Sequence, residues 1–204
     1  MNAAAILVGA AAYGVAAWLG MLLGETLCAG TPPLPGRPVQ VMPPTLLFAG
    51  GGAMLGASVV LHGLPSFQLA TLALVTVALA AAAAADLSAG IVPDLVTLVP
   101  LGALLLSSAI RAQFGPLLSA FVVIIPFAGV AALSKGRGLG WGDVKLAALG
   151  AAILGARGAM FALASACVAA FVVSRVVRPQ GRPIALAPYL VVGICVDLAV
   201  EARA

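Results

Sequence analysis

Long apolar runs, separated by short polar connections, dominate the chain. A membrane-crossing helix needs about 20 apolar residues, whereas the strands of a membrane barrel are about half as long and alternate in polarity. The runs here are continuous, so they predict an all-α, polytopic helical membrane protein with about eight transmembrane helices. The sixth run is short and joins the seventh through the sequence GARG, so this corner allows a different division. The runs lie near residues 3–23, 44–62, 67–86, 93–111, 116–134, 143–156, 159–177 and 185–201.

Composition supports the bilayer as the solvent. Of the 204 residues, 63% are hydrophobic and 8% are charged, and the mean hydropathy is +1.21. A soluble domain carries roughly 25% charged residues. So few charges cannot cover a water-facing surface, and we expect contact with lipid along most helices. The first run carries no Lys or Arg and is longer than the apolar part of a signal peptide, so it is expected to be a retained first span.

Basic residues lie in the short connections, which makes membrane topology the better interpretation of the net charge of +4. No basic cluster is interleaved with aromatic residues, so we expect no nucleic-acid partner. With eight spans, loops 24–43, 86–92, 135–142 and 178–184 are predicted to be cytoplasmic and both termini to face outward. The prolines of 24–43 predict a loop without a regular helix. The cytoplasmic side receives Arg37, Lys135, Arg137, Lys145, Arg175, Arg178 and Arg182, and the outer side receives Arg111, Arg157 and Arg203.

Cysteine and histidine give no sign of a metal site. Cys28, Cys167 and Cys195 are far apart and form no CxxC pair, which predicts neither zinc nor a disulfide framework. The one histidine, His62, has no suitable neighbour for a serine or cysteine nucleophile, and no HExxH sequence occurs. We therefore expect no metal and no cofactor.

Two aspartates occupy the ends of predicted helices. Asp143 opens the sixth run, where a helix N-terminus favours negative charge, but Asp86 closes the third run after an alanine stretch, at the wrong end of the dipole. The predicted topology puts both at the cytoplasmic boundary. Two carboxyl groups that share a proton can serve as acid and base and activate water. Gly138, Gly140 and Gly142 alternate before Asp143, so this segment can adopt positive φ and lie close to an extended substrate strand.

Three motifs resemble those of the type IV prepilin peptidases, a family of GxGD aspartic membrane peptidases related to archaeal preflagellin peptidases. GWGDVKLAALGA contains the GxGD signature, and DLSAGIVPDLVTL is similar to the other aspartate motif. PIALAPYLVVG resembles a late element of the family, although Ala187 stands where glycine is common. The resemblance covers about residues 67 to 200.

The resemblance implies an aspartic endopeptidase that removes the short basic leader of type IV prepilins or pseudopilins at the cytoplasmic face of the prokaryotic inner membrane. Cleavage typically follows a glycine. Asp86 and Asp143 match the two catalytic aspartates. Pro93 and Asp94 match the Pro-Asp/Asn element, which positions the loop or helix. Lys145 follows the GxGD glycines, Gly140 and Gly142, and is expected to orient substrate or phospholipid or to tune the aspartate pair.

The chain also departs from the large members of the family. They carry a cytoplasmic insert with two CxxC pairs that hold zinc, and they methylate the new N-terminus; the short loop 24–43 with its single Cys28 argues against both properties here. We expect an N-terminal two-helix region at 1–66, where this loop replaces the insert, and a six-helix peptidase core at 67–204.

Three alternatives stay open at this point. A non-catalytic transport or assembly protein would carry acids deep in its spans or inverted repeats, which this sequence does not show. A degenerate relative would bind pilins without cutting them, and Ala187 and the short loop leave room for it. A protease of the presenilin or signal-peptide-peptidase kind normally has a Tyr-Asp pair, whereas Ala85 precedes Asp86.

Overall fold

All the regular secondary structure of the described residues is α-helical, which confirms the predicted fold class. The computed structural model describes residues 3–31, 45–61, 66–133, 139–177 and 185–201. The helices are α1 (Ala3–Cys28), α2 (Thr45–Leu61), α3 (Ser66–Ala89), α4 (Asp94–Ile110), α5 (Phe114–Leu133), α6 (Trp141–Val177) and α7 (Ala187–Glu201).

Four of these helices, α1, α3, α5 and α6, are long and apolar enough to cross a membrane. Helices α2, α4 and α7 are apolar but shorter. Large apolar side chains are exposed along the helices, as on α5 at Leu118, Phe121 and Ile125, where lipid is the matching solvent. The expected number of eight crossing helices stays a prediction.

Two helix ends lie further along the chain than the sequence predicted. Helix α1 continues through Cys28, so the first residues of the predicted loop 24–43 are helical. The reason is that Gly24 and Cys28 pack on α3, and the prolines of that loop begin only at Pro32. Helix α3 likewise continues to Ala89, which places Asp86 in its last turn and not at its last residue.

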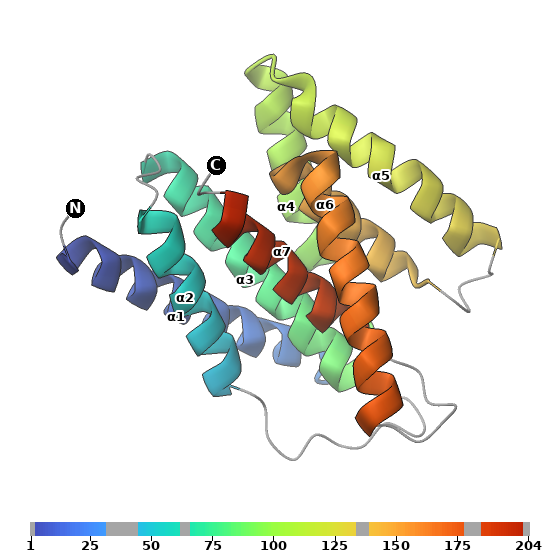
Figure 1. The fold of residues 1–204 in the computed structure, drawn as a ribbon, viewed down its shortest axis with the longest axis horizontal. Coiled ribbons are helices and arrows are strands. Elements are labelled where there is room, and N and C mark those ends of the chain that lie inside the picture. The colour runs from blue at the N-terminus through green and yellow to red at the C-terminus, as the bar shows by residue number, and fades with distance from the viewer. Residues whose placement is uncertain (1–2, 32–44, 62–65, 134–138, 178–184, 202–204) are drawn as a thin grey trace. The chain divides into compact units, whose positions relative to one another are not determined.

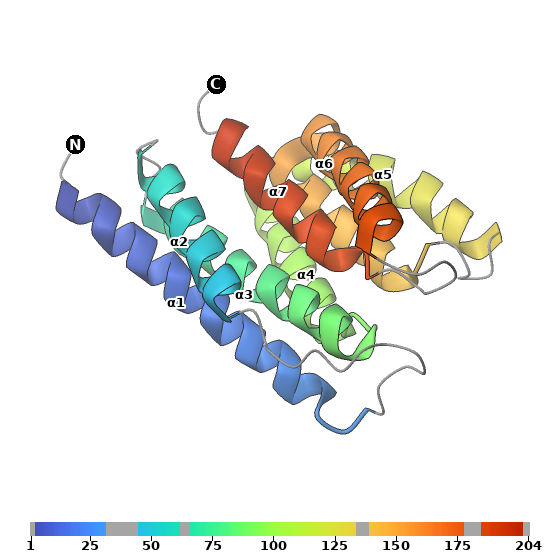
Figure 2. The same ribbon diagram turned by 60° about the horizontal axis from the view of Figure 1, so that its bottom comes forward.

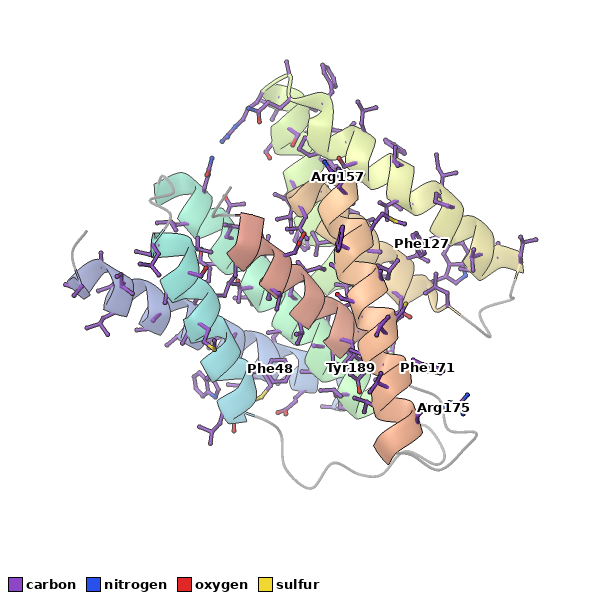
Figure 3. All side chains as sticks on the ribbon, viewed as in Figure 1. Phe48, Phe127, Arg157, Phe171, Arg175 and Tyr189 are labelled. Atoms are coloured by element: carbon purple, nitrogen blue, oxygen red, sulfur yellow. The ribbon has the colours of Figure 1, made fainter. Side chains whose placement is uncertain are left out.

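The predicted corner at GARG is present as a break inside α6. Gly155 has φ 76° and ψ 170°, a conformation that is essentially restricted to glycine. At about 1.5 Å per residue, a straight helix of 37 residues would be about 55 Å long, whereas the hydrocarbon core is about 30 Å thick. The break at Gly155 resolves this mismatch, and the ribbon of α6 turns sharply near Arg157 (Figures 1 and 3).

By packing, the chain divides into two compact units. The first comprises residues 1–90 and 198–204, and the second comprises 91–197. In the first unit, α1 lies alongside α2 and α3 (Figures 1 and 2). A Cβ on Gly56 of α2 would overlap the carbonyl oxygen of Gly9 on α1, so this contact depends on small residues. The Tyr13 hydroxyl donates a hydrogen bond to the Leu69 carbonyl at 2.8 Å, which ties α1 to the start of α3.

In the second unit, α6 packs against α4 and α5 and also against α7. Ile194 of α7 packs against Gly150, before the break in α6, and Gly193 of α7 packs against the Ala162 carbonyl, after the break. Near the end of α6, the Arg175 guanidinium lies 5.1 Å from the centroid of the Phe171 ring (Figure 3). A basic side chain also suits the C-terminal end of the helix dipole. The division expected from the sequence, into an N-terminal region at 1–66 and a peptidase core at 67–204, stays a prediction.

Candidate active site

Asp86 is a buried acid in the last turn of α3. Its residue is 6% exposed, and the alanines from Ala81 to Ala85 before it are all buried. The backbone carbonyl of Asp86 accepts a hydrogen bond from the Gly90 amide at 3.0 Å, and Gly90 has φ 70°. This is the αL ending of a helix, in which glycine takes the left-handed position. The carboxyl group therefore lies at the negative end of the helix dipole, as the sequence predicted.

Helix α1 holds this end of α3 in place. Gly20, Gly24 and Cys28 follow one another at intervals of four, so they share one face of α1. A Cβ on Gly24 would overlap the Ala81 carbonyl and press on Ala84, and Cys28 is buried with Ala85 and Ala89. The turn that bears Asp86 is thus packed against the C-terminal end of α1.

Asp143 lies in the first turn of α6, in the second unit. The Gly140 carbonyl accepts from the Val144 amide at 3.3 Å, which makes Gly140 the N-cap residue and Asp143 the third helical residue. The Asp143 Oδ2 accepts a hydrogen bond from the Gly140 amide at 3.3 Å. An acid that reaches back to the N-cap amide is one half of a capping box. This position favours a carboxylate, as the sequence predicted.

Pro93, Asp94 and Lys145 form a corner between the starts of α4 and α6. Pro93 is the N-cap of α4, with φ −64° and ψ 137°, and Asp94 begins the helix. Proline restricts the preceding residue to extended conformations, which fixes the path of Val92. The Lys145 Nζ donates to the Asp94 Oδ1 at 2.5 Å. The structure therefore brings three of the predicted supporting residues together in one place.

The glycines before Asp143 serve close packing. Neither Gly140 nor Gly142 has a positive φ, so the conformational freedom expected for them is not used. A Cβ on Gly142 would come 2.7 Å from the Cβ of Val92, and a Cβ on Gly140 would come 3.2 Å from the Asp143 Oδ2. Gly142 allows the chain's own Val92 to approach, and Gly140 leaves room for the carboxylate.

The predicted site residues fall into two groups. Asp86 belongs to the first unit, and Pro93, Asp94, Gly140, Gly142, Asp143 and Lys145 belong to the second. Gly138, His62, Arg37, Lys135, Arg137, Arg178, Arg182 and Arg203 lie outside the described residues. Within the described ranges, no group of three or more His, Cys, Asp or Glu residues could hold a metal ion.

The chain has several apolar helices, and four of them are long enough to cross a membrane, which is typical of a multi-pass membrane protein. The sequence profile described as the Type IV leader peptidase family matches residues 73–174, which is half of the chain. The chain belongs to the Type IV leader peptidase family. It is thus a peptidase, a hydrolase whose substrate is a protein. Comparisons with curated proteins and with solved structures gave no match.

Sequence reasoning missed Val92 and the Gly24–Cys28 face of α1. A signal existed for the second, because small residues at intervals of four on an apolar helix indicate a packing face. The signal for Val92 was weaker. Its position before Pro93 predicts an extended backbone but does not predict which residue it contacts. Only the tertiary structure shows that Val92 lies on Gly142.

Proposed function

We propose that this chain removes the short basic leader of type IV prepilins or pseudopilin-like proteins, at the cytoplasmic face of a prokaryotic inner membrane. Asp86 and Asp143 are the catalytic pair. The observation that carries the proposal is the family match, because the matched segment 73–174 contains both aspartates. It also contains Pro93, Asp94, Gly140, Gly142 and Lys145.

The local surroundings of the two acids support different roles for them. The start of α6 favours the carboxylate form of Asp143, so we assign it the general base. Asp86 is buried at the C-terminal end of α3, where negative charge is disfavoured. We therefore assign it the role of general acid, which carries the proton.

The proposed reaction needs water and no cofactor. Asp143 takes a proton from water, and the hydroxide attacks the carbonyl carbon of the scissile peptide while Asp86 donates its proton to the carbonyl oxygen. The carbon–nitrogen bond then breaks as Asp143 gives its proton to the leaving amine. Asp86 recovers its own proton when the carboxyl product forms. Positioning and proton transfer supply the acceleration.

The substrate that fits this chemistry is a membrane protein with an apolar helix and a basic leader. The helix docks laterally among the spans, and the leader stays in the cytoplasm, which presents the scissile bond at the membrane boundary. The predicted cluster of basic loops on one side of the membrane supports this orientation.

The test is cleavage of such a substrate by the purified full chain in detergent or lipid. The probe is a prepilin-like peptide with a basic leader, a glycine before the expected scissile bond and an apolar helix. Mass spectrometry should find one cut, directly after the glycine. A second peptide with that glycine replaced by a bulky residue serves as control. Failure to cut any leader-bearing peptide contradicts the proposed function.

A further inference from the structure

The ion pair between Asp94 and Lys145 joins the beginnings of two helices. Asp94 is the first residue of α4, and Lys145 lies in the second turn of α6. Their side chains are 65% and 26% exposed. A pair this open to water contributes little to stability. Its value therefore lies in the geometry that it fixes and not in the free energy of folding.

A second contact joins the same two segments. Val92 lies two residues before Asp94, and it packs on Gly142, three residues before Lys145. The packing is so close that a Cβ on Gly142 would require Val92 to move. A single contact leaves a helix free to pivot, whereas two contacts on successive turns limit both its displacement and its rotation.

Asp143 lies between these two contacts. It follows Gly142 directly and precedes Lys145 by two residues, so both flanking residues are tied to the start of α4. Its carboxylate also accepts from the Gly140 amide, which limits the side-chain torsion. The orientation of this carboxylate is therefore set from α4 as well as from its own helix.

We propose that Asp94 and Lys145, with Val92 on Gly142, form a positioning latch that orients Asp143 for the reaction. This inference rests on the proposed function. Lys145 acts through Asp94, whose carboxylate accepts a hydrogen bond from its ammonium group. Asp94 and Lys145 are thus positioning residues.

The test is a double-mutant cycle on leader cleavage by the full chain. The variants are Asp94→Asn, Lys145→Met, the two together, and the charge exchange Asp94→Lys with Lys145→Asp. Each single variant should lower kcat about tenfold or more, because a misplacement near 1 Å can reduce a rate by about 10²-fold. KM should change by less than about twofold, because a residue that acts only on the position of Asp143 leaves substrate binding intact. Arg157→Met, which removes a cation at the break in α6, is the control.

The double variant should be no slower than the slower single variant, because coupled residues are not additive. The exchanged pair should recover part of the lost kcat, which a residue with only a packing role would not do. Additive losses would overturn the latch. A raised KM in Lys145→Met, with an unchanged KM in Asp94→Asn, would also overturn it and would show that Lys145 binds the substrate. Those outcomes require a wild-type chain that cuts the peptide, so they are distinct from failure of the proposed function.

Discussion

The ammonium nitrogen of Lys145 lies 2.5 Å from the Oδ1 of Asp94, although 51 positions separate the two residues in the chain. The family motifs contain both residues but do not pair them. Their contact shows that the Pro-Asp motif and the GxGD motif are parts of one corner, where α4 and α6 begin. Asp143 is built into that corner, which makes the geometry of this carboxylate depend on residues far away in sequence.

Gly142 should be intolerant of any side chain. We expect Gly142→Ala to lower kcat about tenfold or more, because the new methyl group would meet Val92 and shift the first turn of α6 that carries Asp143. Cleavage rates of the purified variant measure this. Gly102→Ala is the matched control, because a Cβ there meets nothing within 4 Å. Equal rates for the two variants would show that the Val92–Gly142 contact does not position the acid.

The face of α1 that carries Gly24 should be required for stability and for Asp86. Gly24→Leu would force α1 away from the Ala81 carbonyl, and overpacking of this kind costs about 1–3 kcal/mol. We expect a lower Tm in detergent and a reduced cleavage rate, because the last turn of α3 loses its support. The same substitution at Gly51 of α2, where there is open space, should leave Tm nearly unchanged. A stable and fully active Gly24→Leu variant would contradict this part of the account.

Ala112 should be replaceable by glycine with a gain in stability. Helix α4 ends in a Schellman motif. The Gln113 amide donates a hydrogen bond to the Ser108 carbonyl at 2.8 Å, and the Ala112 amide donates one to the Ala109 carbonyl at 3.1 Å. Ala112 occupies the left-handed position at φ 54°, which is unfavourable for a residue with a Cβ by about 1–2 kcal/mol.

We therefore expect Ala112→Gly to raise the free energy of unfolding by about 1 kcal/mol, measured by thermal or denaturant unfolding in detergent. Ala109→Gly, within the helix, should instead lower it by about the same amount. Destabilisation by both substitutions would show that position 112 is not left-handed in the protein.

The sequence predicted the helical class, the corner at GARG and the placement of Asp143 at a helix start. Each of these follows from local chemistry, because apolar runs, glycine and capping acids act within a few residues. The extension of α1 to Cys28 was missed because it depends on packing against α3. The pairing of Lys145 with Asp94 was missed for the same reason, since one sequence does not state which distant residues meet.

The glycines of the GxGD motif illustrate the same limit. The sequence indicated that Gly140 and Gly142 permit close approach, and they do, but the neighbour of Gly142 is Val92 of the same chain. A small residue shows that something lies close, whereas its partner is determined by the fold. The roles of Asp86 and Asp143 came from the motifs and from the helix ends, and their cooperation stays a prediction.

Single-turnover cleavage kinetics decide whether Asp86 and Asp143 act as one catalytic pair. The rates of Asp86→Asn, Asp143→Asn and the double variant are compared with wild type, and Asp197→Asn on α7 controls for the loss of a membrane acid elsewhere. We predict that each single variant is as inactive as the double variant while the control cleaves at the wild-type rate, because residues that act as a unit are not additive. Leader cleavage by either single variant at the wild-type rate would show that the two aspartates are not a catalytic pair.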